Sequence, residues 1–253
     1  MEIVPTPASF AEVLAEGPFA PSQIQIHWHP APLVPPPAVA AFIDERWQHY
    51  LAQARSEQRD LFNSPMTAVT RFAARPGVLA IELRPSDYKT FMVSCVRDRG
   101  WFERHAPDCI AVTPGNTALL TCDDRAYLGL RSIRVSTYPR RVHAFGGALE
   151  LDPAHPPTAA GALLSHIEKE LHEELGLTSA AFVAAPALLG VYRDPALWQP
   201  EFIWQCQLHA PPDHVHPHEH DGLISFGPVA VGDEELLTPA AAAALRSWRS
   251  QHA

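Results

Sequence analysis

The alternation of hydrophobic and polar positions predicts a small α+β unit in the first part of the chain. Residues 24–28 alternate as a strand does, within a proline-rich opening of about 35 residues that is otherwise expected to be extended. After three consecutive prolines, residues 38–59 carry hydrophobic side chains at helical spacing, which predicts an amphipathic helix. Two strands are then predicted at 67–72 and 78–83, joined by a turn at 74–77.

From residue 110 onward the pattern changes to short β-rich runs. The runs 117–122 and 126–135 are separated by Asp123 and Asp124, which favour a tight turn, so the two runs are expected to form a hairpin. A long helix is predicted over 158–175, ended by Gly176 in the left-handed conformation. Further strands are predicted at 110–112, 181–192, 202–208 and 223–226, and a final helix at 239–248.

The mixed order of strands and helices indicates the fold class. It favours an α+β protein, an α/β/α sandwich with a mixed sheet, over a doubly wound parallel sheet. We expect two domains. The first, at residues 1–104, is the N-terminal α+β unit with a role in positioning substrate, and the second spans residues 105–253.

Composition and charge narrow the classes of partner. The formal net charge of −9 and the spread of basic residues along the chain argue against binding nucleic acid through its phosphates. The four cysteines show no CxxC spacing, which argues against a zinc ribbon and favours a reduced, cytoplasmic compartment. Neither a signal peptide nor a membrane span is predicted, and the sequence leaves the oligomeric state open.

Three glutamates gather on one face of the helix predicted over 158–175. At 100° per residue, Glu173 and Glu174 lie about −60° and +40° from Glu170, so the three share an arc of about 100°. Like charges at this spacing destabilise an isolated helix, and a bound divalent metal would remove that cost. The neighbouring arc is hydrophobic and is expected to face the core, through Leu164, Ile167, Leu171 and Leu175.

A solvated helix face would explain these glutamates equally well, but their context favours chemistry. Gly146 and Gly147 lie upstream, where the absence of side chains lets the backbone approach a metal or a phosphate closely. Carboxylates beside such a loop supply the hard oxygen ligands that Mg²⁺ needs for attack on a pyrophosphate. A metal-dependent phosphohydrolase site is therefore the interpretation we favour.

These residues resemble the box of the Nudix hydrolase superfamily, G-x5-E-x7-R-E-U-x-E-E-x-G-U, in which U is a bulky aliphatic residue. Residues 169–177 (KELHEELGL) match its second half with one change, and residues 146–150 (GGALE) match its common opening. Gly147 and Glu170 are 23 positions apart (170 minus 147) where the pattern has about 15, so about eight residues are inserted around 152–158. Lys169 replaces the box arginine and cannot make its planar bidentate contact, while Gly161 stands at the first box glutamate.

The resemblance implies a Nudix-type sandwich over residues 105–253 and hydrolysis that depends on Mg²⁺, with Mn²⁺ as an alternative ion. By the resemblance, Glu170, Glu173 and Glu174 are catalytic and hold the metal together with Gly146, and Glu219 is a candidate general base. The layout over about residues 40–230 is similar to the divergent branch that hydrolyses UDP-glucose and UDP-galactose to UMP and a sugar 1-phosphate. The segments that carry this similarity are 87–91, 130–134, 189–193 and 201–206.

Five residues are candidates for substrate binding. Arginine side chains can grip a phosphate through two hydrogen bonds, and a glutamate after the box often adds a metal or water contact in this superfamily. Tyr88, and also Trp101, could stack on a uracil ring, with core packing as the alternative. The five candidates are Arg131, Arg134, Arg193, Glu201 and Tyr88.

Alternating histidines form a separate feature near the end of the chain. They are His214, His216, His218 and His220, in a loop that contains proline. Imidazole nitrogens bind transition metals, so a metal site and an exposed, solvated loop are both compatible with this pattern.

Other functions remain open at this point. The chain could hydrolyse another nucleoside diphosphate derivative such as ADP-ribose. It could instead sense nucleotide sugars without turnover, an alternative motivated by Lys169 and Gly161. A structural or partner-binding domain is the remaining class.

Overall fold

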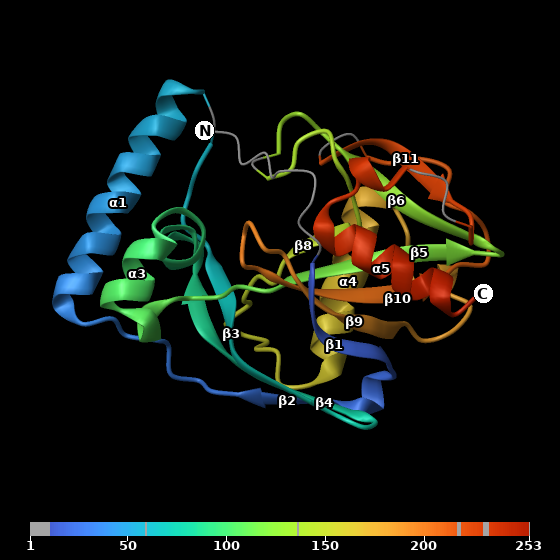
Figure 1. Ribbon diagram of the computed structural model, residues 1–253, viewed down its shortest axis with the longest axis horizontal. Coiled ribbons are helices and arrows are strands. Elements are labelled where there is room, and N and C mark those ends of the chain that lie inside the picture. Colours follow the sequence, from blue (N-terminus) through green and yellow to red (C-terminus); the bar gives the residue numbers. More distant parts are fainter. Residues whose placement is uncertain (1–10, 59, 136, 217–218, 230–232, 253) are drawn as a thin grey trace.

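The computed structural model describes residues 11–58, 60–135, 137–216, 219–229 and 233–252, and it contains two β-sheets (Figure 1). The larger sheet has eight strands in the order β1-β9-β10-β5-β6-β11, with β7 paired to β6 and β8 paired to β5. Strands β10 and β5 run parallel and the other pairs run antiparallel, so the sheet is mixed. The strands are β1 (Glu12–Phe19), β5 (Gly115–Cys122), β6 (Arg125–Arg131), β7 (Val142–His143), β8 (Phe145–Ala148), β9 (Ala187–Arg193), β10 (Pro200–Gln207) and β11 (His220–Phe226).

Two long helices cover opposite faces of the larger sheet: α4 (Ala160–Leu175) and α5 (Pro239–Ser250). Successive side chains of β5 point to opposite faces, as the pleat of a strand requires. Ala118 and Leu120 pack in the core beneath α4, whereas Leu119 packs in the core beneath α5. The result is a layered α+β arrangement around a mixed sheet, which confirms the fold class expected from the sequence.

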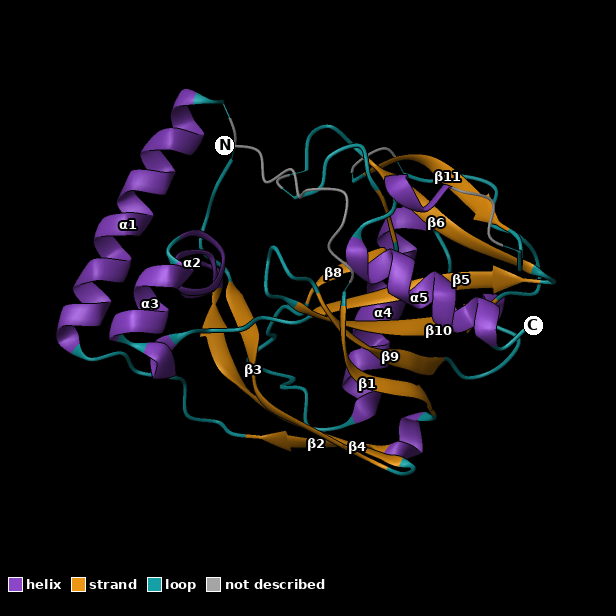
Figure 2. Ribbon diagram, in the orientation of Figure 1, coloured by secondary structure: helices purple, strands orange, loops and turns teal. Residues whose placement is uncertain are grey.

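The smaller sheet and four helical segments make up most of the remaining N-terminal part. The sheet has the order β2-β4-β3, with β2 parallel and β3 antiparallel to β4. Helices α1 and α3 lie at the end of the molecule remote from the larger sheet (Figure 2). The elements are β2 (Ile24–Trp28), β3 (Pro65–Arg75), β4 (Val78–Asp87), α1 (Pro37–Ser56), α2 (Tyr88–Phe91), the π-helical turn η2 (Met92–Arg97) and α3 (Arg99–His105). Short 3₁₀ turns occur at η1 (Pro21–Gln23), η3 (Pro107–Cys109), η4 (Ser179–Ala181) and η5 (Asp233–Leu236).

Helix α4 forms where its periodicity predicts it. Ile167, Leu171 and Leu175 are buried as the hydrophobic seam requires, and Leu163 replaces the partly buried Leu164 as the fourth core residue. Gly176 ends the helix at φ +66°, and its N–H donates to the carbonyl of His172, so the expected left-handed terminus is confirmed.

Several boundaries differ from the sequence predictions. Strand β1 lies in the opening that was expected to be extended, and it pairs with β9 at the edge of the larger sheet, where Pro18 removes no internal hydrogen bond. The run 110–112 supplies a single β-bridge, between Val112 and Val69, and β6 already ends at Arg131. The division between residues 104 and 105 remains a prediction, and β1 belongs to the larger sheet.

Two smaller expectations concern side chains. Trp101 stacks on Phe42 with ring centroids 3.9 Å apart, so its ring is used in packing within the N-terminal part. All four cysteines are buried and free. Within the described residues, none of the helices has the length and apolar character needed to span a membrane.

Candidate active site

The glycine pair of β8 lies directly against the acidic face of α4. The N–H of Gly146 donates a 2.9 Å hydrogen bond to Oε2 of Glu174, whose side chain is buried. A methyl group on Gly147 would lie 3.3 Å from Oε2 of Glu170, so the strand approaches that carboxylate closely. Gly146 has φ +124°, a conformation that favours glycine. The fold therefore brings together the two segments that the sequence singled out.

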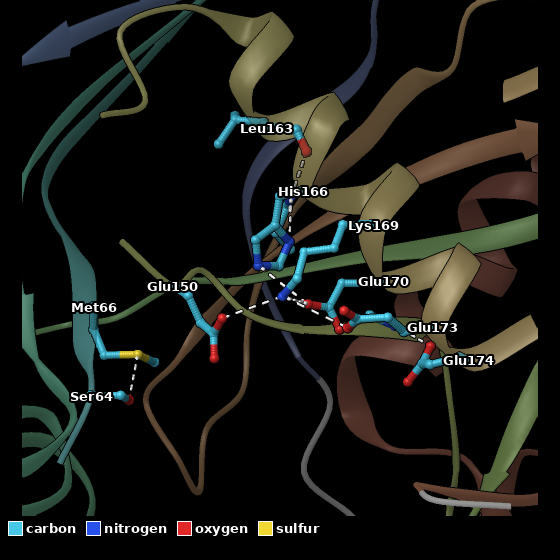
Figure 3. Close-up of polar contacts among 11 residues, drawn as sticks. Ser64, Met66, Glu150, Leu163, His166, Lys169, Glu170, Glu173 and Glu174 are labelled. Carbon is cyan, nitrogen blue, oxygen red and sulfur yellow. Dashed lines mark hydrogen bonds and ion pairs between the residues drawn. The ribbon is translucent and has the colours of Figure 1, made fainter. Parts of the chain in front are cut away.

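Lys169 provides the positive charge within the acidic cluster (Figure 3). Its Nζ lies 3.4 Å from Oε2 of Glu150 and 3.7 Å from both Oε1 of Glu170 and Oε2 of Glu173. Burial raises the pKa of Glu170 to about 7; Lys169 opposes the shift, and Glu174 adds to it. Lys169 thus lies close to Glu150, after the glycine pair, and to the two glutamates of α4, although an ammonium cannot make the planar bidentate contact of an arginine.

Glu174 has a second partner that the sequence did not reveal. Nε2 of His220 lies 3.1 Å from Oε1 of Glu174, and the imidazole is fully buried against Phe145. The sequence left His220 in a loop that was either exposed or metal-binding. The exposed alternative is wrong for this residue, because it begins β11 and packs over Gly129, where a methyl group would lie 2.3 Å from its Nδ1.

A divalent cation can be tested against this donor set. Within the described residues, no group of three or more His, Cys, Asp or Glu side chains is placed to hold a metal ion. Mg²⁺ does not require such a cage, because it usually binds one or two carboxylates and completes its shell with water and substrate phosphates. One oxygen of Glu170 and one of Glu173 already lie 3.7 Å from a cation, the ammonium of Lys169. The donor chemistry therefore fits a hard ion.

A cavity of about 260 Å³ adjoins the glycine pair. One wall comes from the larger sheet and contributes polar groups, and the other comes from α2 and η2 and is largely apolar. Five of the residues proposed from the sequence as catalytic, metal-binding or substrate-binding line this cavity, and they are Tyr88, Arg131, Gly146, Glu201 and Glu219. Residues separated by more than 100 positions therefore share one site.

Among the described residues that line the cavity, Arg131 is the one arginine or lysine. Its Nε donates to the carbonyl of Thr137 at 3.1 Å, which fixes the guanidinium at the end of β6. Burial lowers its pKa, and the nearby carboxylates Glu219 and Glu174 act in the opposite direction. The group stays charged and is the natural partner for an anion entering the cavity.

Glu201 is a buried carboxyl with an unused oxygen. Its side chain lies over Gly115, where a methyl group would be 2.0 Å from Oε2, and that oxygen has no hydrogen-bond partner among the described residues. Burial raises its pKa to about 8, with Asp194 adding to the shift and Arg131 opposing it. Near pH 7 the carboxyl is therefore mostly protonated and can donate a hydrogen bond.

We expect the substitution Glu201→Gln to change how stability depends on pH. The unfolded carboxyl ionises near 4.5 and the folded one near 8, so wild-type protein loses stability as pH rises between these values. Glutamine removes this loss, which is on the order of a few kcal/mol. Urea unfolding of both proteins at about pH 5 and pH 8 measures it. Parallel pH profiles for the two proteins would contradict the burial-shifted ionisation.

Two predicted substrate residues lie away from the cavity. Arg193 forms an ion pair with Glu12 of β1, and its guanidinium lies 3.9 Å from the ring centroid of Trp198. Arg134 is exposed in the loop after β6, and its backbone N–H donates to Oγ of Ser132. Neither side chain lines the cavity, whereas Arg131 does.

Tyr138, His143 and Asp194 also line the cavity and were not foreseen from the sequence. Tyr138 donates a short hydrogen bond to Asp194, whose other oxygen accepts the N–H groups of Ala196 and Leu197. His143 is buried against Thr238, and burial lowers its pKa well below the usual value, with Arg131 and His220 adding to the effect. No local sequence signal marks these residues, because each acts through a partner at least 56 positions away.

No protein-family model and no curated protein sequence matches the chain. Among solved structures it is similar to a MutT Nudix hydrolase from Burkholderia pseudomallei, at 21% identity over 53% of this chain and 96% of that one, with a TM-score of 0.35. A Nudix hydrolase from Nitrosomonas europaea gives 14% identity over 57% and 77% of the two chains, with a TM-score of 0.34. A bifunctional NMN adenylyltransferase/ADP ribose pyrophosphatase from Francisella tularensis gives 14% over 61% and 45%, with a TM-score of 0.41. At these values, function has to be inferred from the residues of the site.

Proposed function

We propose that the chain is a Nudix-type pyrophosphohydrolase that cleaves a nucleoside diphosphate sugar in the cytoplasm. UDP-glucose and UDP-galactose are the preferred substrates, and the products are UMP and a sugar 1-phosphate. The reaction depends on Mg²⁺, with Mn²⁺ as an alternative ion. The observation that carries the proposal is the contact of Glu170 and Glu174 with the glycine pair, beside a cavity that holds Arg131.

The acidic face of α4 supplies the metal ligands in this proposal. Glu170 and Glu173 hold the ion, with the carbonyl of Gly146 and the carboxylate of Glu174 as the further ligands that the superfamily resemblance implies. Glu174 also accepts the N–H of Gly146 and contacts the ring nitrogen Nε2 of His220, so it orients the glycine pair as well. When bound, Mg²⁺ polarises the phosphoryl oxygens and lowers the pKa of a water molecule.

The cavity residues divide the remaining tasks. Arg131 binds the diphosphate in bidentate fashion. Glu201 is mostly protonated near pH 7, so it serves as a hydrogen-bond donor to a phosphate oxygen, and Glu219 is left to accept the proton of the attacking water. The water oxygen forms a new bond to phosphorus, the P–O bond of the anhydride breaks, and the leaving phosphate takes the electron pair.

The apolar wall of the cavity would contact the uncharged end of the substrate. Tyr88, Phe91 and Met92 face the cavity opposite the polar wall. A flat ring such as a nucleobase is the ligand group that aromatic and thioether side chains contact favourably. The N-terminal part would then position the substrate, as its predicted role requires.

A non-catalytic sensor is the second candidate, and one observation favours it. The ammonium of Lys169 already neutralises part of the acidic cluster, so a nucleotide sugar could bind without a metal. A Nudix hydrolase that acts on ADP-ribose or a similar diphosphate remains the third.

One assay distinguishes these functions. Purified protein is incubated with UDP-glucose, UDP-galactose, ADP-ribose and a dinucleoside polyphosphate, with Mg²⁺, with Mn²⁺ and with a chelator. The proposal expects UMP and a sugar 1-phosphate, formed only when a metal is present. Turnover of ADP-ribose alone would reassign the substrate, whereas binding of UDP-glucose without turnover would identify a sensor. If no diphosphate is bound or cleaved, the enzyme proposal fails.

A further inference from the structure

A pair of histidines stands outside the cavity, where the loop after β10 crosses the C-terminal end of α4. A methyl group on Gly176 would lie 3.8 Å from Nε2 of His216 and 3.9 Å from Nε2 of His214, so both nitrogens lie within 4 Å of one point beside the end of α4. The two rings are 5.5 Å apart at their centroids and inclined by 38°. We propose that His214 and His216 form a binding site for a transition cation such as Zn²⁺.

The other ring nitrogen of each histidine, Nδ1, already has a hydrogen-bond partner. Nδ1 of His216 lies 2.6 Å from the carbonyl oxygen of Glu173, an acceptor, so this nitrogen carries the proton. Nδ1 of His214 lies 2.5 Å from a carboxylate oxygen of Asp213. In metal-bound histidines one nitrogen commonly donates to a carbonyl or carboxylate in this way, which leaves the lone pair of the other nitrogen for the metal. Neither Nε2 has a hydrogen-bond partner among the described residues.

The ring spacing suits a shared ion. Zinc binds imidazole nitrogen at about 2.0–2.1 Å with tetrahedral angles, which places the centroids of two coordinating rings roughly 5 Å apart. The observed 5.5 Å is close to that value.

The surroundings favour a cation. The site lies at the C-terminal end of α4, where the aligned carbonyl groups give the helix its negative pole. The N–H of His216 donates to the carbonyl of Glu174, so the histidine loop is already joined to this end of the helix. Two imidazoles are a partial ligand set, and water molecules complete the shell. His218, the third histidine of the original pattern, lies outside the described residues.

A bound ion would attach the loop more firmly to the C-terminal end of α4. The same loop leads into β11, which begins with His220, the partner of Glu174. Occupancy of the histidine site is therefore expected to stabilise the fold at the end of α4. This inference does not depend on the proposed hydrolase activity, because its ligands are imidazoles and its test measures binding.

The test is a calorimetric titration of the full chain with Zn²⁺ in the presence of excess Mg²⁺, which occupies hard oxygen sites. We expect one zinc ion per chain and an increase in Tm on binding. His214→Ala and His216→Ala should each weaken the affinity by about tenfold or more, because even the loss of a residue that only supports a ligand costs about 10–100-fold. Zinc-edge diffraction from a soaked crystal should place the ion between the two Nε2 atoms.

Two controls keep the test sharp. His209→Ala removes an exposed histidine of the same loop that is not part of the pair, so it should change the affinity less than twofold. Glu170→Gln should leave zinc binding unchanged. Equal losses of affinity in all three histidine variants would show that zinc binds nonspecifically, and this would overturn the site. Two other results would also overturn it: a loss of affinity in Glu170→Gln alone, or no binding of zinc to the wild-type protein. The Tm of each variant without zinc verifies that it is folded.

Discussion

Replacing Glu170 by glutamine is expected to reduce metal-dependent hydrolysis of UDP-glucose by at least about 100-fold. The side chain faces Gly147 and lies between His166 and Lys169, so it joins the glycine pair to the acidic cluster. Glutamine preserves the shape and the packing but removes the charge that binds a hard cation. Initial rates over a range of Mg²⁺ concentrations measure the effect, which should appear as a lower rate that more Mg²⁺ only partly restores.

The matched control is Glu168→Gln. It removes one charge from the same helix, but position 168 is about 160° around the helix from position 170 and is directed away from the acidic face. Its activity should stay within about twofold of wild type. If both variants lose activity equally, net charge and not a metal ligand explains the result. If Glu170→Gln retains full activity, the carboxylate does not hold the catalytic ion.

The second large effect is on stability. Gly146→Ala is expected to destabilise the protein by about 2–4 kcal/mol, from backbone strain and overpacking together. The residue has φ +124°, and a methyl group there would lie 2.5 Å from the carbonyl oxygen of Asn116 and 2.9 Å from Cα of Thr117. These atoms belong to the backbone of β5 and cannot rotate away. The hydrogen bond from Gly146 to Glu174 would be displaced as well. Urea unfolding gives the change in free energy.

Gly161→Ala is the control for this variant. Gly161 is in the first turn of α4, and a methyl group there meets no atom within 4 Å. Alanine should therefore be neutral or stabilise the protein by up to about 1 kcal/mol, because glycine has the greater entropy in the unfolded chain. A loss of stability equal to that of Gly146→Ala would mean that glycine content, and not the close approach of β8 to β5, determines the result.

Local patterns in the sequence were sufficient to predict the helices and strands that bury one face. The period of the hydrophobic residues predicted α4 and its end at Gly176, and alternation predicted β2 at its observed bounds, Ile24–Trp28. Each of these patterns is complete within a short segment, because a helix or strand that packs on a core repeats its buried positions at a fixed interval. The crowding of Glu170, Glu173 and Glu174 follows from the same helical geometry.

Contacts between distant segments did not follow from local patterns. Strand β1 is recognisable only through its pairing with β9, about 170 positions later, and its proline and glycine content argues against a strand when read alone. The same holds for the site. Arg193 and Arg131 are both arginines near the end of a strand, yet Arg193 pairs with Glu12 and Arg131 lines the cavity.

The sequence by itself therefore determined a helical face on which three carboxylates gather and a glycine pair that can approach it, and the proposed chemistry starts from these two features. Only the tertiary structure decided which charges meet. It buried His220 against Glu174, raised the pKa of Glu201 by enclosing it over Gly115, and placed Lys169 among the carboxylates. The physical reason is that burial and pairing depend on which faces pack together, and those faces come from segments far apart in the chain.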